Sequence, residues 1–144
     1  MTLNIAILYT GEIRTIEKTI DIFKQNILAD SLNIHVFAIL QGDIKIENWF
    51  REKMGSHLKS LEWFERTDIV WKSIQKRLIH NLVIEEHWKA YLENSGSMIE
   101  YYQLYLAYSN MVKHEYNTNI QYNFIMRMRP DIIINKPIDF SIFN

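Results

Sequence analysis

The chain has 144 residues, of which 48% are hydrophobic and 13% aromatic, with a formal net charge of −1 and no cysteine. This length and composition indicate a single compact domain over residues 1–144 and exclude a disordered or low-complexity chain. The near-zero charge gives no electrostatic case for binding nucleic acid or an anionic membrane. Without cysteine, disulfides, thiolate metal sites and thiol catalysis are excluded.

The N-terminal sequence and the distribution of apolar residues indicate the compartment. Residues 1–9 lack the basic region and the long apolar core of a secretory signal peptide. No apolar run approaches the roughly 20 residues that a membrane-spanning helix needs. We therefore expect a soluble, cytoplasmic protein without a membrane span.

The first predicted unit is a strand followed by a turn and a helix. The isoleucine-rich run from Asn4 to Tyr9 is typical of a strand that is buried on both faces of a parallel sheet. Residues 10–15 break this run. Apolar residues then recur at the spacing of an amphipathic helix, with Thr15 as the expected N-cap. These apolar residues are Ile16, Ile20, Phe23 and Ile27.

The turn between this strand and this helix is a candidate ligand site. Gly11 would let the backbone come close to a ligand, and the N-terminus of a helix favours anions. Arg14 lies just before that N-terminus, within reach of a phosphate. The sequence contains neither the G-x-G-x-x-G pattern nor a P-loop, and an ordinary turn is an equal alternative.

The middle of the chain predicts two further strands separated by a short helix. Ile34 to Leu40 is a second buried strand, and Leu58 to Phe64 is a third. Between them, Asp43 is the expected cap of a short helix that stops at Gly55. The apolar residues of this helix are Ile46, Trp49, Phe50 and Met54.

Two helical regions precede the last strand. The pattern that starts at Asp68 is long for one helix, so we expect it to be bent or divided before residues 94–96. Its expected apolar line consists of Ile74, Leu78, Leu82, Trp88 and Leu92. Ser97-Met-Ile-Glu100 is a capping box, which predicts the start of a second helix that ends within residues 116–119.

This second helix has a broad apolar face, which we expect to lie in the core rather than to bind a cofactor. Its members are Tyr101, Leu104, Tyr105, Tyr108, Met111 and Val112. Tyr102 and Gln103 fall on another side. A surface position is the default expectation for both, with a cleft as the alternative.

The last strand, Tyr122-Asn-Phe-Ile-Met-Arg-Met-Arg-Pro-Asp131, ends in a cluster of charges that we expect at the rim of a sheet. Arg127, Arg129 and, if the chain stays extended, Asp131 share one face, and an apolar run follows at residues 132–134. A buried guanidinium needs anionic partners or a wet cleft. The motif therefore indicates a site for an anion, with a metal ion on Asp131; the alternative is a structural Arg–Asp pair.

The order of elements, β-α-β-α-β-α-α-β, predicts a three-layer α/β/α Rossmann-like sandwich with a mostly parallel sheet. The five histidines show no metal-site spacing, and no G-x-S-x-G elbow is present. Carboxylates stand at three expected strand ends, at Glu12, Asp43 and Asp131. They would form a metal or acid–base cluster only if the order of the strands brings these ends together.

Two segments resemble motifs of a group of glycosyltransferase-like proteins from bacteria and large DNA viruses. Residues 7–15, Ile-Leu-Tyr-Thr-Gly-Glu-Ile-Arg-Thr, resemble the S-G-x-x-R-T start of that group. Residues 122–132 resemble its Y-D-x-V-I-R-x-R-x-D strand, and the Tyr/Gln-rich helix at residues 101–105 is also typical. The resemblance covers most of the chain and implies a minimal or truncated GT-A fold.

The resemblance also implies the roles of individual residues. Thr10, Gly11 and Arg14 would line the nucleotide site, and Arg127 and Arg129 would contact the diphosphate of a nucleotide-sugar, expected to be UDP-linked. Guanidinium groups fit phosphate in a bidentate manner, and Mn²⁺ or Mg²⁺ prefers oxygen ligands. Asp131 would be the catalytic residue and the ligand of that divalent metal.

The sequence departs from the GT-A pattern in two ways. Arg129 occupies the position of the first acid of a D-x-D motif, which argues for reduced or absent metal use. The sequence stops at Asn144, before the segment that normally supplies the acceptor site and the catalytic base.

Two hypotheses follow. In the first, the protein binds a nucleotide-sugar and, if active, transfers the sugar to an unknown acceptor, with the acceptor site supplied by the second subunit of a homo-oligomer. In the second, it is a catalytically silent binding or scaffold protein, acting as a dimer or as the partner of a full-length enzyme. A natural chain that continues beyond Asn144 would favour the enzyme, and a dimer contact through Trp49, Trp63 or Trp71 would favour the dimer. The expected location is the cytoplasm of a bacterium or of a virus-infected cell.

Overall fold

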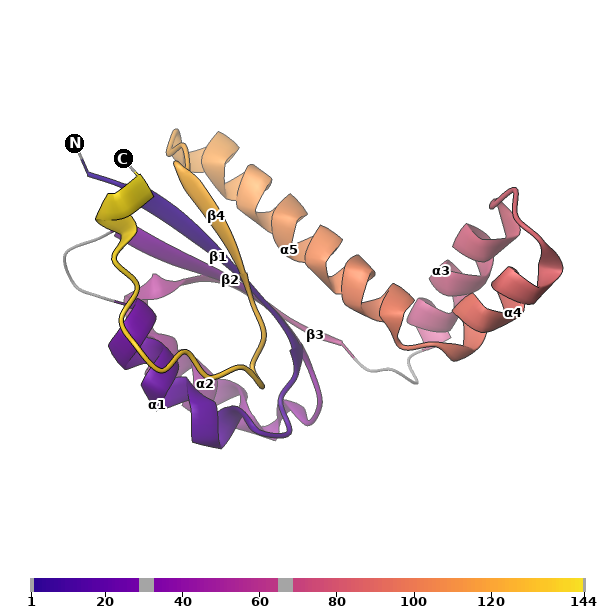
Figure 1. The fold of residues 1–144 in the computed structure, drawn as a ribbon, viewed down its shortest axis with the longest axis horizontal. Coiled ribbons are helices and arrows are strands. Elements are labelled where there is room, and N and C mark those ends of the chain that lie inside the picture. Colours follow the sequence, from indigo (N-terminus) through magenta and orange to yellow (C-terminus); the bar gives the residue numbers. More distant parts are fainter. Residues whose placement is uncertain (1, 29–32, 65–68, 144) are drawn as a thin grey trace.

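The computed structural model describes residues 2–28, 33–64 and 69–143 (Figure 1). The elements are β1 (Asn4–Glu12), α1 (Ile16–Ile27), β2 (Asn33–Gln41), α2 (Glu47–Met54), β3 (Leu58–Phe64), α3 (Ile69–His80), α4 (Glu86–Asn94), α5 (Ser97–Thr118) and β4 (Phe124–Met128). Short 3-10 helices at Ile44–Ile46, Gly55–His57 and Phe140–Phe143 complete the fold.

The four strands form one parallel sheet in the order β3-β2-β1-β4. Helices α1 and α2 cover one face of this sheet and α5 covers the other (Figure 1), so the predicted three-layer α/β/α Rossmann-like fold is confirmed. The chain leaves β1 through α1 toward β2 on one side, and it returns through α5 to place β4 on the other side. This reversal makes the boundary between β1 and β4 a topological switch point.

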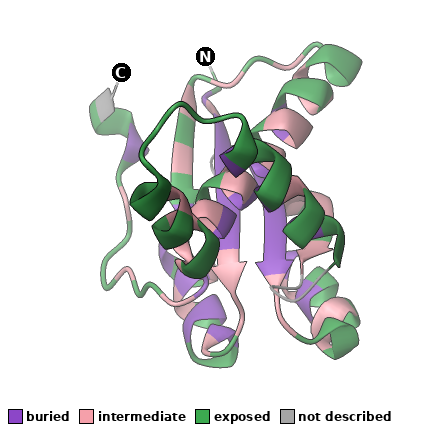
Figure 2. Cartoon of the chain, turned by 90° about the vertical axis from the view of Figure 1, so that its right-hand side faces the viewer, coloured by how far each residue is buried: buried purple, intermediate pink, exposed green. Residues whose placement is uncertain are grey.

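The core lies on both faces of β1 and β2, whose side chains alternate between two apolar clusters. The larger cluster joins Ile5, Ile7 and Tyr9 to the inner faces of α1 and α2. The smaller one joins Ala6 and Leu8 to α5. Figure 2 shows the buried positions concentrated in these strands and in the helix faces next to them. This burial confirms the prediction that both strands are covered on two sides.

The first strand continues further than its sequence suggested. Residues 10–12 were expected to break it, but Gly11 and Glu12 pair with Leu40 and Gln41 of β2 and belong to β1. Helix α1 starts after Thr15 as predicted. The Thr15 hydroxyl makes no capping hydrogen bond and is buried without a partner, so the predicted side-chain cap is wrong.

The next elements agree closely with the sequence. Strands β2 and β3 lie where they were predicted. Asp43 accepts a hydrogen bond from the backbone N–H of Lys45 at 2.9 Å, and this cap starts the 3-10 turn that leads into α2. Gly55 ends α2 with a φ of +55°. The predicted stop of this helix is confirmed, whereas its N-cap position is occupied by Ile46 and Asp43 caps only the 3-10 turn before it.

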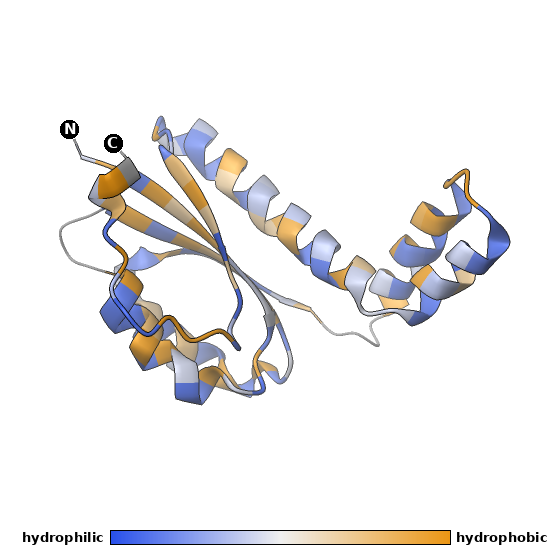
Figure 3. Cartoon of the chain, in the orientation of Figure 1, coloured by the Kyte–Doolittle hydropathy of each residue, from blue (hydrophilic) through white to orange (hydrophobic). Residues whose placement is uncertain are grey.

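The long helical region was expected to be bent or divided, and it is divided into α3 and α4. The expected apolar line is wrong, because Leu78 and Leu82 are exposed whereas Trp71, Gln75 and Ile79 are buried. Asp68, the expected start of the region, lies outside the described residues. The two helices form a hairpin beside the start of α5 (Figure 1), and the loop that joins them is hydrophobic (Figure 3).

Helix α5 starts at Ser97 as predicted, but its capping box does not form: Ser97 contacts the Ser95 hydroxyl, and Glu100 accepts from Arg129. The buried residues are Ile99, Gln103, Ala107 and Met111. Of the predicted core face only Met111 is buried and Leu104 half-buried, so this prediction, like the surface default for Gln103, is wrong. No helix in the described ranges, α5 included, is long and apolar enough to cross a lipid bilayer.

Strand β4 places alternate residues on opposite faces. Phe124, Met126 and Met128 pack on the larger cluster, as their shared parity predicted. Tyr122 precedes the strand and departs from that parity, because it packs on the smaller cluster. The start of β4 is tied to β1 by Asn123, whose backbone and side chain both bond to Asn4.

The segment after β4 lies along α1 (Figure 1) rather than continuing the buried sheet. The Thr19 hydroxyl donates to the carbonyl of Pro130, and the Asn26 amide donates to the carbonyl of Ile134. Ile132 and Ile133 are exposed, so the apolar run after Asp131 does not enclose the charges as expected. These contacts fix the direction in which the chain continues from the end of β4 through Asp131.

Candidate functional site

The carboxyl ends of β1 and β4 lie side by side at the switch point. Tyr9 is paired with Met128, so Gly11 and Pro130 come together just beyond that pair. A Cβ atom on Gly11, whose φ is +138°, would lie 3.2 Å from Cδ of Pro130. Gly11 therefore allows the two chain segments to approach, which places the first turn next to Arg129 and Asp131.

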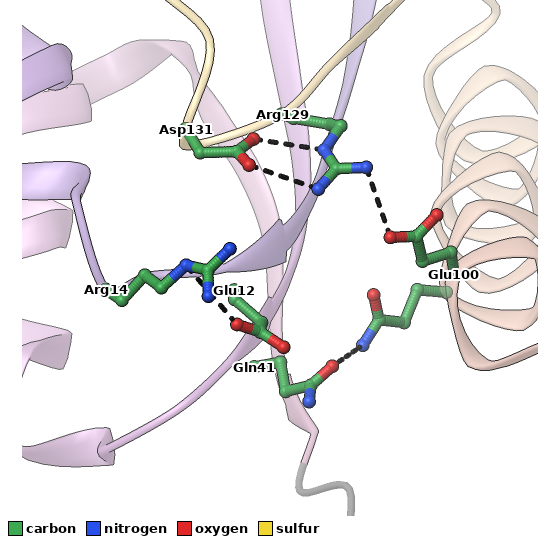
Figure 4. A network of polar contacts seen from close by, with 7 residues as sticks. Glu12, Arg14, Gln41, Glu100, Arg129 and Asp131 are labelled. Atoms are coloured by element: carbon green, nitrogen blue, oxygen red, sulfur yellow. Dashed lines mark hydrogen bonds and ion pairs between the residues drawn. The ribbon is translucent and has the colours of Figure 1, made fainter. Parts of the chain in front are cut away.

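Arg129 is the centre of the polar contacts at this edge (Figure 4). Its Nε and Nη2 donate to the two carboxylate oxygens of Asp131 at 3.0 and 3.1 Å, and its Nη1 donates to Oε1 of Glu100 at 3.1 Å. These hydrogen bonds lower the pKa of Asp131 below its ordinary value of 3.8 and raise the pKa of Arg129. The pair is the arrangement that the sequence left open as a structural alternative.

Arg14 faces the same space from the first turn (Figure 4). Its side chain is 71% exposed, and its Nε lies 3.6 Å from a carboxylate oxygen of Glu12. The charge of Arg14 also contributes to the lowered pKa of Asp131. We call Glu12, Arg14, Glu100, Arg129 and Asp131 the switch-point site.

Helix α5 contributes Glu100, which the sequence did not assign to a site, and Gln103, for which a cleft was the alternative to a surface position. Glu100, expected in a capping box, binds Arg129, and one turn later the buried Gln103 donates to Oε1 of Gln41 at the end of β2 (Gln41 is labelled in Figure 4). The spacing of three residues puts both side chains on the face of α5 that looks toward the strand ends. This spacing is the signal that could have identified them.

A groove of about 500 Å³ lies beside the switch-point site, between the first turn and the turn after β2. Glu12 and Arg14 belong to both the groove and the site. The remaining lining residues are Ile13, Ile16, Glu17, Gln41, Gly42, Asp43 and Ile46. Glu12 and Asp43 thus line one groove, whereas Asp131 is paired with Arg129 outside it.

Two of the candidate residues lie away from the switch-point site. Thr10 is buried within β1, with only 2% of the residue exposed. Arg127 is exposed on β4, paired with Leu8 of β1, in a separate shallow groove with tyrosines of α5. The structure brings together Gly11, Arg14, Arg129 and Asp131, and it does not bring Arg127 to them.

The arrangement does not fit a divalent metal ion at Asp131 as it stands. Both oxygens of Asp131 accept from the Arg129 guanidinium, whose positive charge would repel a cation. Among residues 2–28, 33–64 and 69–143, no three acidic or histidine side chains are placed to hold a metal ion together. A metal ion here stays a prediction that requires Arg129 to move away.

Comparison with known proteins gave no relative. No protein-family model, no curated protein and no solved structure matches the chain. The resemblance of residues 7–15 and 122–132 to glycosyltransferase-like motifs therefore stays a prediction. Function has to be inferred from the geometry of the switch-point site.

Proposed function

We propose that the protein binds a nucleotide-sugar, UDP-linked, at the switch-point site. The observation that supports this proposal is the convergence of Arg14, Arg129 and Asp131 at the carboxyl ends of β1 and β4. In open α/β sheets, ligands bind in the crevice outside these strand ends, where the direction of the connections reverses. The first turn and the N-terminus of α1 face this crevice, and the N-terminus of a helix favours an anionic group.

Arg14 is the residue that would contact the diphosphate. Its ion pair with Glu12 is exposed and long, and exposed pairs of this kind contribute only about 0–1 kcal/mol. Arg14 can therefore exchange the carboxylate of Glu12 for a phosphate at little cost. A guanidinium offers two parallel N–H donors, which match two phosphate oxygens.

Arg129 would be the second contact to the diphosphate. Asp131 and Glu100 occupy three of its N–H groups, and a guanidinium has two more to donate. Because its plane is already fixed by the Asp131 carboxylate, little rotational freedom remains to be lost on binding. Asp131 thus acts as a positioning residue for Arg129 in the binding step.

The balance of charges at the site selects among phosphorylated ligands. The three carboxylates of Glu12, Glu100 and Asp131 exceed the two guanidinium groups by one negative charge. A ligand that carries only phosphates would meet repulsion from this excess. A nucleotide-sugar adds many hydroxyl groups, which donate hydrogen bonds to carboxylates, so it satisfies both kinds of side chain.

The proposal is tested by calorimetric titration with UDP-glucose, UDP-N-acetylglucosamine and GDP-mannose, with and without Mn²⁺. We expect one of the two UDP-sugars but not GDP-mannose to bind saturably, and Arg14→Ala to weaken that binding by about tenfold, the loss of one charge-assisted contact. Arg77→Ala removes an equally charged, exposed residue on α3 and should leave the affinity unchanged. Failure of all three to bind to folded protein would overturn the proposal.

Transfer of the bound sugar is the next step of the same proposal. Arg14 and Arg129 would stabilise the negative charge that develops on the departing diphosphate. Release of UDP from a bound UDP-sugar, in the presence of an acceptor, measures this step. Binding without any release would leave a nucleotide-sugar-binding protein and contradict the transferase.

The silent scaffold protein is the second candidate function, and the contacts of Arg129 favour it. Its guanidinium joins the end of β4 to the first turn of α5, which is what a purely structural ion pair would do. In that case Asp131→Asn would lower stability, and no nucleotide-sugar would bind to the wild type. Saturable binding to the wild type contradicts this alternative.

A further inference from the structure

The chain turns away from the sheet after β4, and one peptide group of this turn is held at both of its polar ends. Its carbonyl, that of Pro130, accepts a hydrogen bond from the Thr19 hydroxyl of α1. Its N–H belongs to Asp131 and bonds to the Asp131 carboxylate. A single peptide group therefore joins helix α1 to the acidic side chain of the switch-point site.

The Asp131 carboxylate extends this connection to Arg129 (Figure 4). Its two oxygens accept from Nε and Nη2 of the guanidinium, and Nη1 donates to Glu100. A continuous series of hydrogen bonds thus leads from Thr19 through one peptide group and one carboxylate to the guanidinium. Hydrogen bonds arranged in series polarise and strengthen one another.

The Thr19 hydroxyl is oriented by burial and by a second buried hydroxyl, that of Tyr9. Thr19 is 3% exposed, so water does not compete for its hydroxyl. The Tyr9 phenol, also buried, forms a hydrogen bond with the Thr19 side chain, and burial raises the pKa of Tyr9 so that the phenol keeps its proton. Tyr9 can therefore donate to the Thr19 oxygen, while the Thr19 proton goes to the carbonyl of Pro130.

A threonine within a helix has an ordinary alternative, because its hydroxyl can bond to a carbonyl of the preceding turn. In α1 that acceptor is the carbonyl of Ile16, at 3.4 Å, and the carbonyl of Pro130 lies closer. The hydroxyl is therefore directed out of the helix, toward the segment that carries Asp131. A function confined to α1 does not explain this direction.

The place of Thr19 in the chain also relates the two arginines of the site. Thr19 lies near the start of α1, the helix that follows Arg14. Arg129 and Asp131 come from the distant end of the chain, which lies along α1 (Figure 1). The Thr19 hydroxyl thus ties the segment of Asp131 to the helix whose N-terminus is next to Arg14.

We propose that Thr19 is a positioning residue of the switch-point site. Its hydroxyl, supported by the Tyr9 phenol, holds the peptide group before Asp131 and thereby the guanidinium of Arg129. The same contact sets the spacing at which Arg14 and Arg129 face a diphosphate, and this part rests on the proposed function. The hold on Asp131 and Arg129 is present in the free protein and can be measured there.

The test compares wild type with Thr19→Val, which keeps the shape but loses the hydroxyl, and with Thr19→Ser, which keeps the hydroxyl. NMR of the free protein measures the pKa of the Asp131 carboxyl and the resonance of the Arg129 Nε–H. In Thr19→Val we expect the pKa of Asp131 to rise toward its ordinary value of 3.8 and the Arg129 resonance to shift. Thr19→Ser should restore both wild-type values.

The matched control is Asn26→Leu. Asn26 is also a buried residue of α1, and its amide donates to the carbonyl of Ile134, further along the same segment. This substitution likewise removes one donor between α1 and the segment, so it should lower stability about as much as Thr19→Val. It should leave the pKa of Asp131 and the Arg129 resonance unchanged. Equal effects of the two variants on this pKa, or no effect of either, would overturn the positioning role of Thr19.

Titration with the UDP-sugar that binds the wild type measures the effect on the ligand. Thr19→Val should bind it about fivefold more weakly, the loss expected when one long side chain has to be ordered on binding. Thr19→Ser and Asn26→Leu should bind it as the wild type does. Unchanged affinity in Thr19→Val, together with an unchanged pKa of Asp131, would overturn the inference and leave the proposed function standing.

The reverse outcome is distinguishable. If no nucleotide-sugar binds the wild type, the proposed function is overturned and the effect on a diphosphate with it, while the pKa of Asp131 still decides whether Thr19 positions this side chain.

The wild type alone supplies a check that holds even if Thr19→Val does not fold. A hydroxyl proton that is bonded to a carbonyl and shielded from water exchanges slowly enough to be detected by NMR. We expect to detect the Thr19 hydroxyl proton, with a nuclear Overhauser contact to Pro130. A Thr19 hydroxyl that exchanges freely with water would contradict the inference.

Discussion

The guanidinium of Arg129 joins the segment that follows β4 to helix α5, because it binds both Asp131 and Glu100. The Asp131 carboxylate, in the segment after β4, accepts hydrogen bonds from Nε and Nη2 and so fixes the plane of the guanidinium. Glu100, on α5, accepts a hydrogen bond from Nη1. A lysine at this position would keep the charge but would lack the planar array of N–H donors, so it could satisfy only one of these carboxylates at a time. The energetic value of the pair is best measured through its dependence on pH.

We predict that Asp131→Asn lowers the free energy of unfolding at pH 7 by about 1 kcal/mol. The pKa of Asp131 is lower in the folded than in the unfolded protein, so the stabilisation is fully present above about pH 4. It is lost as the pH falls through the folded pKa. Urea unfolding at pH 7, 5 and 3 should therefore show the two proteins converging at low pH.

The control for this measurement is Glu52→Gln, which changes an exposed carboxylate of α2 far from the switch-point site. It should leave the stability nearly unchanged at every pH. A difference between wild type and Asp131→Asn that stays constant down to pH 3 would contradict an ionic origin.

His35 gives a second prediction at this scale. Burial, followed by the charges of Lys59, His114 and His57, lowers its pKa from 6.5 to about 4, and the ring contacts the Tyr122 hydroxyl at 2.6 Å. Because the folded pKa lies below the unfolded one, stability is full above pH 6.5, falls as the pH drops toward 4 and levels off below it. NMR titration should place the midpoint of His35 near 4.

The same prediction can be checked by unfolding. His35→Gln removes one titrating ring, so the loss of stability between pH 6.5 and pH 4 should become smaller. It should not vanish, because burial also lowers the pKa of His114. A His35 midpoint near 6.5 in the folded protein would contradict the prediction.

At the scale of elements, strands were easier to predict from the sequence than helix faces. The runs that became β1 and β2 are apolar at nearly every position, so no choice of face was needed. Helix α5 offers two lines at helical spacing, one through Tyr101 and Tyr105 and one through Gln103 and Ala107. Periodicity cannot choose between them; the small Ala107 allows a close approach to the sheet, which only the assembled structure reveals.

The site was predictable to the extent that it lies on contiguous segments. Arg14 and the Arg129–Asp131 pair were identified because each stands at the end of a recognisable strand. Arg127 was grouped with Arg129 by strand parity, but β4 ends at Met128 and Pro130 turns the chain, so the two arginines separate. Glu100 comes from another element, and its contact with Arg129 depends on tertiary packing.

The turns after β1 and β2 carry a prediction of their own. Gly42 has a φ of +147°, and a Cβ atom there would lie 2.4 Å from Cγ1 of Ile13, so Gly42→Ala combines backbone strain with a clash. We expect it to cost about 2 kcal/mol in thermal or urea unfolding. Gly11→Ala meets a milder contact at 3.2 Å and should cost less.

The loss of ligand affinity should rank these two glycine variants in the opposite order to their loss of stability. Gly11→Ala pushes on Pro130 and should disturb the distance between Arg14 and Asp131, whereas Gly42→Ala acts on the neighbouring groove. Nucleotide-sugar affinity should therefore fall more in Gly11→Ala than its small loss of stability suggests. Equal stability of Gly42→Ala and wild type would contradict the clash.

At the scale of the whole molecule, burial is very unequal. The sheet and the inner faces of α1 and α2 hold the larger cluster, whereas α4 has no buried residue and packs mainly on α3 at the far end of the chain's long axis (Figure 1). Local opening should follow this distribution, because segments with few buried contacts open at low free energy.

We predict that the backbone amides of Glu86–Asn94 exchange hydrogen well before those of β1 and β2. Hydrogen exchange followed by mass spectrometry, on peptides covering α4, α1 and the two strands, measures the order directly. Helix α1 is the internal control, since it has similar secondary structure and a buried face. If the amides of α4 were as protected from exchange as those of α1, the hairpin of α3 and α4 would have to be buried against another surface in solution.

The pairing of β1 with β4 has a consequence for the way the chain becomes functional. It joins Asn4 to Asn123, 119 positions apart, which is a contact of very high sequence separation. Closing so long a loop costs entropy that only the finished sheet offsets, and such pairings slow folding. During synthesis Arg14 emerges early and Arg129 late, so the switch-point site stays incomplete until β4 has docked on β1. If the site binds a ligand as proposed, binding would report the docking of β4, because no earlier stage contains both halves of the site.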